Sequence, residues 1–310
     1  MKKLEHKFPY EWTLKEAVFT KDKGTVFSCF ACGGGSTMGY KLAGFDVLGC
    51  NEIDPKMIEA YRTNHNPKYS YLEPIQTFKL RKDLPKELYN LDILDGSPPC
   101  SSFSMAGNRE KDWGKEKKFR EGQAKQVLDD LFFDFIDLAK ELQPKIVVAE
   151  NVKGLLQGNA IKYVRQIYRE FDKAGYYVQH WLLNAAKMGV PQRRERVFFI
   201  ALRKDLAKPF LTQKDLFTVA PELELKFNEK VIKYNEVKRG VGRKASDLYY
   251  ERWEQRVDSD RDSFCNGGTY PSDYNFLKNK PEYLIGMSVP PVMTAQIATR
   301  IHEQWLSKMK

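Results

Sequence analysis

The chain has 310 residues, of which 42% are hydrophobic and 30% are charged. This is typical of a globular protein with one large and one small domain. The sequence contains no run of eighteen apolar residues and no apolar core of a signal peptide, so we expect a cytoplasmic protein without a membrane span. Five cysteines and four histidines indicate a reduced chain and predict no disulfide framework and no metal site.

The formal net charge is +10. A basic excess favours a polyanionic partner such as nucleic acid, because each Lys or Arg placed against a phosphate releases counterions. It is equally compatible with a basic and highly soluble protein, so charge alone does not decide between the two.

Short apolar runs of β type alternate with segments of helical periodicity. A helix through Met38, Leu42 and Ala43 is expected to be capped by Ser36, and Pro55 fits the first turn of the next helix. Strands are predicted at 26–30, 45–50, 91–94, 146–149, 177–183 and 196–202, and further helices at 56–64, 129–142, 161–171 and 293–305. This alternation predicts an α/β fold with a mostly parallel sheet and helices on both faces.

The character of the chain changes after the last of these strands. Residues 204–280 are rich in charged residues and tyrosine and show weak periodicity, and an apolar pattern resumes near 283. We therefore expect a large domain at 1–203, a small basic domain at 204–280, and a C-terminal segment at 281–310 that returns to the large domain.

A glycine-rich loop at 31–36 joins the first predicted strand to the first predicted helix. Glycines allow close approach of the backbone to a ligand. Glu52 follows the next strand, about twenty residues later, where a carboxylate can bind both hydroxyls of a ribose. The pairing favours a nucleoside-bearing cofactor over a purely structural turn. A P-loop is excluded because no Gly-Lys-Ser/Thr sequence follows.

Two further candidates follow predicted strands. Cys100 comes after Pro98 and Pro99, which stiffen its approach, and nearby cations can activate a thiol held in this way. Glu150 can serve as a general acid or hydrogen-bond donor. Taken singly, an inert cysteine and a capping or solvated carboxylate are the ordinary explanations.

Arginines are dense at residues 192–196, just before the last predicted strand. They suit contacts with phosphates or carboxylates, although a surface charge run is the ordinary explanation. Cys29 and Cys32 form a Cys-x-x-Cys pair without a second pair, and Cys29 lies in a predicted core strand. We therefore expect neither zinc nor redox chemistry there.

The order of these elements is more specific than any one of them. The glycine-rich loop, Glu52, Pro-Cys, Glu-Asn-Val, Gln-Arg-Arg-Glu-Arg, a basic variable region and a late Gly-x-Ser-Val resemble the ordered motifs of the DNA cytosine-5 methyltransferase family. The resemblance covers about residues 24–203 and 281–305. It implies a Rossmann-like S-adenosylmethionine-dependent methyltransferase fold. In it, 1–203 bind the cofactor and carry catalysis, and 204–280 form a smaller target-recognition domain.

The resemblance also implies roles for individual residues. Cys100 is the expected nucleophile, Glu150 contacts the cytosine edge, and Arg194 and Arg196 orient the site. The residues expected to bind S-adenosylmethionine are Phe30, Ala31, Gly33, Gly35, Glu52, Ile53, Pro99, Ser288 and Val289.

The sequence lacks a recognisable arginine-leucine-threonine segment in residues 255–275, has a short recognition region, and departs from the usual family pattern at three single residues. Cys32 stands where glycine is usual, so Gly33 is expected to supply flexibility to the loop. Pro74 stands where an acid commonly contacts adenine, and Glu73 is the candidate substitute. In the late motif, Met287 replaces an asparagine.

The expected partner is double-stranded DNA, and a cognate restriction endonuclease acting on the same site is a candidate second partner of a monomeric bacterial or phage modification enzyme. Three alternatives remain open: a tRNA cytosine-5 methyltransferase of the same family, a catalytically silent nucleic-acid-binding protein, and a nicotinamide oxidoreductase. The last explains the glycine-rich loop but not the Pro-Cys and Glu-Asn-Val elements. The recognised DNA sequence cannot be read from the chain, because it depends on how side chains of the small domain meet base edges.

Overall fold

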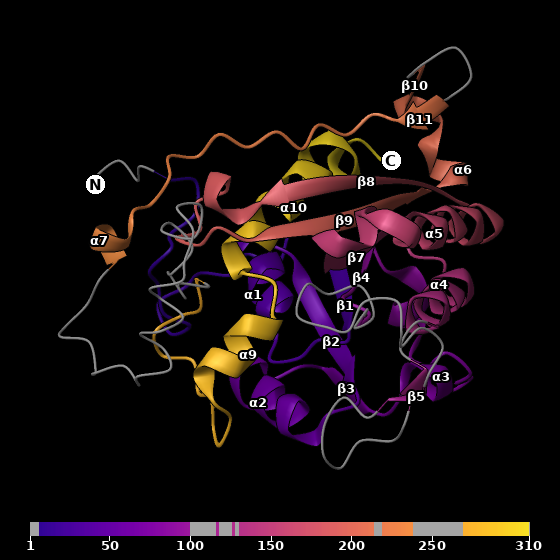
Figure 1. The fold of residues 1–310 in the computed structure, drawn as a ribbon. Coiled ribbons are helices and arrows are strands. Elements are labelled where there is room, and N and C mark those ends of the chain that lie inside the picture. The colour runs from indigo at the N-terminus through magenta and orange to yellow at the C-terminus, as the bar shows by residue number, and fades with distance from the viewer. Residues whose placement is uncertain are drawn as a thin grey trace.

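The computed structural model describes residues 6–99, 116–117, 126–127, 130–213, 219–237 and 269–309. Within these ranges, seven strands form one sheet in the order β3-β2-β1-β4-β7-β9-β8 (Figure 1). The strands are β1 Thr25–Cys29, β2 Asp46–Glu52, β3 Tyr69–Leu72, β4 Ile93–Gly96, β7 Ile146–Val152, β8 Tyr176–Asn184 and β9 Glu195–Arg203. Two short hairpins pair β5 Glu116–Lys117 with β6 Gln126–Val127 and β10 Leu211–Gln213 with β11 Val219–Pro221.

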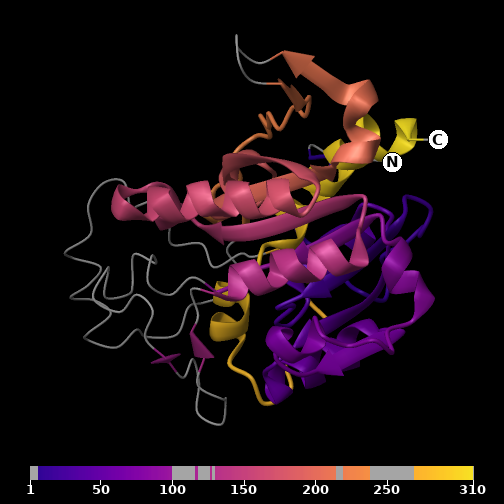
Figure 2. The same ribbon diagram turned by 90° about the vertical axis from the view of Figure 1, so that its right-hand side faces the viewer.

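The helices cover both faces of the sheet. They are α1 Gly35–Leu42, α2 Pro55–His65, α3 Ile75–Phe78, α4 Leu131–Leu142, α5 Ile161–Lys173, α6 Lys204–Ala207, α7 Tyr234–Val237, α9 Pro281–Met287 and α10 Pro291–Gln304. The α4 and α5 helices pack on one face, and α1 and α10 pack on the other (Figures 1 and 2). None of the helices in the described ranges is long and apolar enough to cross a membrane.

The strand directions confirm the predicted mostly parallel sheet. Strands β3, β2, β1, β4 and β7 run parallel, and β9 is antiparallel to both of its neighbours, β7 and β8. Of the parallel strands, β1, β2, β4 and β7 are buried on both faces, which explains why they read as short continuous apolar runs in the sequence.

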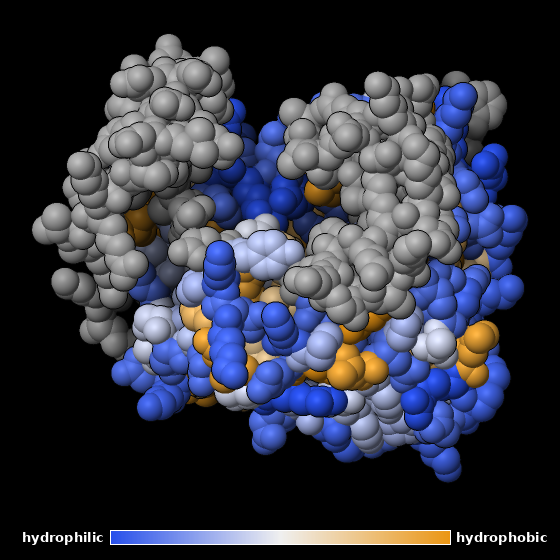
Figure 3. Space-filling view, turned by 60° about the horizontal axis from the view of Figure 1, so that its bottom comes forward, coloured by the Kyte–Doolittle hydropathy of each residue, from blue (hydrophilic) through white to orange (hydrophobic). Residues whose placement is uncertain are grey.

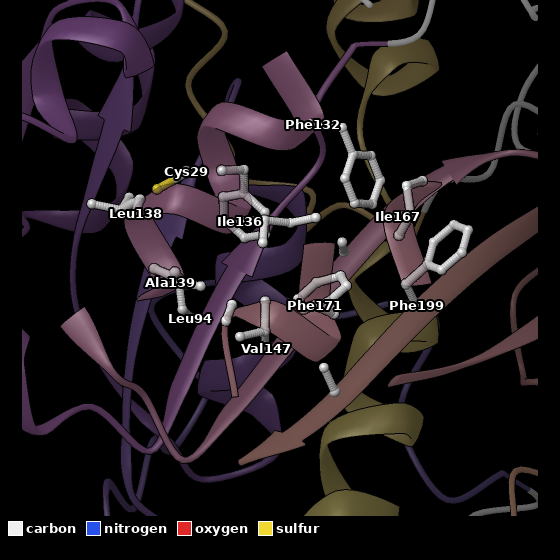
Figure 4. Close-up of a cluster of buried hydrophobic side chains, with 14 of the residues drawn as sticks. Cys29, Leu94, Phe132, Ile136, Leu138, Ala139, Val147, Ile167, Phe171 and Phe199 are labelled. Carbon is white, nitrogen blue, oxygen red and sulfur yellow. The ribbon is translucent and has the colours of Figure 1, made fainter. Parts of the chain in front are cut away.

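Alternate residues of these strands enter two separate cores. Leu94, Val147 and Phe199 pack with Phe132 and Ile136 of α4 on one face (Figure 4). On the other face, Ile93, Val148 and Ile200 pack with side chains of α1 and α10. The two cores hold the carboxyl ends of the central strands at a fixed spacing.

The start of α2 agrees with the prediction from the sequence, but the cap of α1 does not. Asp54 caps α2 by accepting the backbone N–H of Lys56 at 2.8 Å, and Pro55 occupies the first turn as predicted. The prediction that Ser36 caps α1 is wrong. The N-cap is Gly34 in the left-handed region, with φ of 85°, and the Ser36 hydroxyl instead donates to Asp95 at 2.7 Å.

The first part of the expected small domain packs on the large one. Residues 219–233 run as an extended segment along β8 and α10 (Figure 1). Leu223 and Leu225 are buried in the same core as Trp305, whose indole N–H donates to the carbonyl of Glu222 at 2.7 Å. These residues therefore complete the outer face of the large domain.

Candidate active site at the carboxyl edge of the sheet

The predicted site residues gather at one edge of the sheet. Strands β1, β2, β4 and β7 are parallel, so their carboxyl ends meet at the same edge, and the amino end of antiparallel β9 lies there too. Phe30 follows β1, Glu52 ends β2, Pro99 follows β4, Glu150 lies near the end of β7, and Arg196 lies at the start of β9. Cys100 lies outside the described residues, one position beyond Pro99.

The glycine-rich loop is built from alternating left-handed residues. Phe30 has φ of 52°, Cys32 has φ of 49°, and Gly34 has φ of 85°. The expectation that Gly33 replaces the flexibility of a glycine at position 32 is therefore wrong, because Cys32 itself adopts the left-handed conformation and Gly33 does not. Such a backbone costs a non-glycine residue about 1–2 kcal/mol.

Glu52 stabilises this strained loop. Its Oε2 accepts the backbone N–H of Cys32 at 2.7 Å, and its Oε1 accepts the N–H groups of Ile53 and Asp54, each at 2.9 Å. Burial raises the pKa of the Glu52 carboxyl, and these hydrogen bonds oppose the rise. A carboxylate has about four acceptor positions, so about one remains for a ribose hydroxyl. The residues at this edge thus fit a nucleoside.

Two side chains that the sequence did not single out hold the carbonyl of Gly33. The Tyr274 hydroxyl donates to it at 2.6 Å, and His65 Nε2 lies 3.2 Å away. Burial lowers the pKa of His65 to about 3, so the ring is neutral and can donate only through the nitrogen that carries its proton. Two donors from separate segments therefore fix this peptide of the loop.

The late segment, at Ser288 and Val289, contacts the glycine-rich loop. A Cβ on Gly35 would lie 2.5 Å from the carbonyl oxygen of Val289 and 2.8 Å from the Ser288 side chain, so only glycine fits this contact. The Tyr270 hydroxyl donates to Ser288 Oγ at 2.6 Å. The return to the large domain thus includes residues before 281.

Arg194 holds the late segment in place. Its Nη2 donates to the carbonyls of Gly286 and Ser288, at 3.0 and 3.1 Å. Burial and the nearby charge of Arg196 lower the pKa of Arg194 to about 10, so it stays charged at neutral pH. The contact links the start of β9 to the loop that borders the expected cofactor site.

The expected catalytic acid is paired. Arg196 Nε lies 3.0 Å from Glu150 Oε1, and both side chains are largely buried. The neighbouring Asn151 donates from Nδ2 to the carbonyl of Pro98 at 3.3 Å. The end of β7 therefore contacts the loop that leads to Cys100.

The candidate adenine acid has other partners. Glu73 Oε1 lies 2.9 Å from Arg81 Nη1, and Glu73 Oε2 accepts the hydroxyl of Thr77 at 3.1 Å. Pro74 is the N-cap of α3. In the described ranges, no group of three or more His, Cys, Asp or Glu side chains is placed to hold a metal ion.

Comparison with known proteins identifies the family. The model for the C-5 cytosine-specific DNA methylase family matches residues 24–263. The chain belongs to this family. The type II methyltransferase M.FnuDI of Fusobacterium nucleatum is 38% identical over 181 residues, which are 58% of this chain and 47% of that protein. M.NgoPII of Neisseria gonorrhoeae is 36% identical over 190 residues, 60% of this chain and 50% of that protein.

The chain spans about half the length of the curated relatives that it matches. Solved structures share its fold at low identity. A protein from an E. coli prophage, described as a DNA modification methyltransferase, has a TM-score of 0.59 at 19% identity and covers 90% of this chain and 99% of its own. The S. pombe Dnmt2 methyltransferase has a TM-score of 0.52 at 16% identity, covering 90% and 99%.

Proposed function

We propose that this protein transfers a methyl group from S-adenosylmethionine to C5 of a cytosine in a specific sequence of double-stranded DNA. The observation that carries the proposal is that the candidate cofactor-binding and catalytic residues lie together at one edge of the sheet. The Glu52 carboxylate lies at the glycine-rich loop, and the buried Glu150–Arg196 pair lies next to the segment that leads to Cys100.

The cofactor is assigned to the glycine-rich loop. Glu52 would accept a ribose hydroxyl beside Ile53, and Phe30 would lie against the adenine. The remaining contacts are assigned to Ala31, Gly33, Gly35, Pro99, Ser288 and Val289. When bound, S-adenosylmethionine supplies the methyl group as an electrophile on a cationic sulfonium.

Cys100 is proposed as the nucleophile. C5 of cytosine is a weak nucleophile because its electrons belong to an aromatic ring. Addition of the Cys100 thiolate forms an Sγ–C6 bond, breaks the aromaticity and turns C5 into an enamine carbon. After C5 has gained the methyl group, loss of its proton and cleavage of the Sγ–C6 bond restore the ring and release the thiolate.

Glu150 and Arg196 are proposed to stabilise this adduct. Electron density that leaves C6 accumulates toward N3, where a proton or hydrogen bond from Glu150 stabilises it. Arg196 pairs with Oε1 of Glu150 and would hold the carboxyl in place, and Oε2 is the oxygen that we propose to face the base. Arg194 acts through the late segment, whose carbonyls it binds.

The target cytosine must be flipped out of the DNA duplex, because the proposed catalytic residues cannot reach its C5 and C6 atoms inside it. Flipping a base costs a few kcal/mol, which phosphate contacts offset. The net charge of +10 suits such contacts, and the coloured residues on the face shown in Figure 3 are largely hydrophilic. We propose that target recognition belongs to the range 204–280, of which 219–233 also pack on the large domain and 238–268 lie outside the described residues. A cognate restriction endonuclease is the proposed partner.

Transfer of a labelled methyl group tests the proposal. Purified protein is incubated with labelled S-adenosylmethionine and either double-stranded DNA or tRNA. Label at C5 of cytosine in DNA supports the proposal. Label in tRNA alone would assign the tRNA-directed activity, and label in neither would contradict both.

A further inference from the structure

Asp95 is a buried carboxylate that the proposed mechanism does not use. It is the third residue of β4, and its relative exposure is 4%. Its Oδ2 accepts the hydroxyls of Ser28 and Ser36, each at 2.7 Å, and its Oδ1 accepts the Tyr40 hydroxyl at 3.2 Å. Within the described residues, its hydrogen-bond partners are hydroxyl groups, and no cation pairs with it.

The location of these partners places the charge next to the cofactor loop. Ser28 is the penultimate residue of β1, and Ser36 is the second residue of α1, so the two serines flank the glycine-rich loop on either side. Asp95 itself lies five positions before Cys100 on the strand that leads to it. The strand that leads to the nucleophile thus carries one buried negative charge beside the cofactor loop.

This charge changes what the start of α1 can bind. A helix N-terminus carries a partial positive charge and ordinarily favours an anion such as a phosphate. Here the carboxylate of Asp95 accepts the hydroxyl of Ser36 in the first turn, so a negative charge lies beside that end of the helix. A second anion would be repelled, whereas a cation would be attracted.

The burial of Asp95 is costly in the absence of a ligand. Burial raises the pKa of Asp95 to about 6 although three hydroxyl groups donate to it, and the neighbouring Glu150 adds to the rise. A buried carboxylate without a cationic partner lowers the stability of the fold unless a bound cationic ligand compensates its charge.

We infer that Asp95 makes the cofactor site selective for the cationic sulfonium of S-adenosylmethionine over the neutral thioether of its product, S-adenosylhomocysteine. This inference rests on the proposed function. The two molecules differ by one methyl group and one positive charge. A fixed negative charge in a poorly solvated site therefore favours the substrate, and favours release of the product.

Calorimetric titration of the full chain with each of the two molecules tests the inference. Asp95→Asn removes the charge but keeps an oxygen acceptor for the serines and an amide that can donate to Tyr40. We expect it to weaken binding of S-adenosylmethionine about tenfold, equal to about 1.4 kcal/mol, and to change binding of S-adenosylhomocysteine less than about twofold.

Asp92→Asn is the matched control. Asp92 lies just before the other end of β4, where it accepts the N–H of Thr25 at 2.7 Å and pairs with Lys145 at 2.7 Å. It should leave the affinity ratio of the two molecules unchanged. Equal weakening of both molecules by Asp95→Asn, or no change in their ratio, would overturn the inference. If the wild-type chain binds neither molecule, the proposed function fails instead.

Thermal melting shows whether the variants are folded. Asp95→Asn is expected to melt at or above the wild-type temperature, because it removes a buried charge. Asp95→Ser, which is smaller and also neutral, provides a second measurement of the affinity ratio. If neither neutral variant folds, Asp95 is a structural residue and the inference is wrong.

Discussion

Arg196 and Glu150 form an ion pair across neighbouring strands, with Arg196 Nε 3.0 Å from Glu150 Oε1. In the antiparallel ladder of β7 and β9, Arg196 pairs with Val152, two positions after Glu150. Both side chains thus project from the same face at the end of the two strands. The pair fixes the direction of the acid that we propose to contact the flipped base.

Replacing the acid should stop catalysis without unfolding the protein. Glu150→Gln cannot deliver a proton, so we expect kcat to fall by about 10²–10⁴-fold, with little change in the affinity for S-adenosylmethionine. Single-turnover methyl transfer and calorimetry measure the two effects. Glu195→Gln is the control, because Glu195 pairs with Lys153 in a half-exposed bridge. Equal loss of activity in both variants would contradict the role of Glu150.

Asp95 should make stability depend on pH. Its pKa is about 6 in the folded protein and near 3.8 when unfolded, so the folded state holds the proton more tightly. Stability is therefore lost as pH rises from about 4 through 6, by up to about 3 kcal/mol at neutral pH. Asp95→Asn should be more stable than wild type, and its advantage should grow by about 1 kcal/mol between pH 5 and pH 8. Chemical denaturation at both pH values measures this, and an advantage that shrinks with pH would contradict it.

The left-handed backbone at Cys32 predicts a specific tolerance. Cys32→Gly should keep cofactor binding, because glycine adopts a φ of 49° without strain. Cys32→Val should lower the free energy of unfolding by about 1–2 kcal/mol and weaken cofactor binding, because β-branched residues are disfavoured there. Thermal melting with and without S-adenosylmethionine measures both. A valine variant as stable as the glycine variant would refute the strained conformation.

Tyr274 should influence cofactor binding through Gly33. Tyr274→Phe removes the hydrogen bond to the Gly33 carbonyl, which is worth about 1 kcal/mol. We expect a several-fold higher KM for S-adenosylmethionine with a nearly unchanged kcat. Tyr89→Phe is a control on the exposed η1 helix, Lys86–Asn90. A fall in kcat without a change in KM would argue against a positioning role.

The parallel core of the fold was predictable because its strands are buried on both faces. The runs at 26–30 and 146–149 contain few polar residues, so they read as strands without any knowledge of their partners. The edge strand β3, Tyr69–Leu72, is only partly buried and mixes polar and aromatic residues, so no apolar run marks it. The insertion of β9 between β7 and β8 depends on long-range pairing, which local patterns do not encode.

The positions of Glu52 and Glu150 near the ends of strands were predictable from the apolar runs before them, but the contacts that support the glycine-rich loop were not. His65, Tyr274 and Asp95 act on the glycine-rich loop across 32, 241 and 59 positions of sequence, by way of Gly33 and Ser36. A serine near a helix start reads as a cap, and only the tertiary position of Asp95 shows that Ser36 has another partner. The packing of 219–233 was likewise hidden by their polar composition.

The most direct test of the central claim is bisulfite sequencing of DNA from cells that express the chain or its Cys100→Ser variant. Bisulfite converts cytosine but not 5-methylcytosine, so it reports both the reaction and the site. The account predicts protected cytosines within one short sequence for the wild type and none for the variant. Absence of protection in the wild type, or full protection with Cys100→Ser, would contradict it.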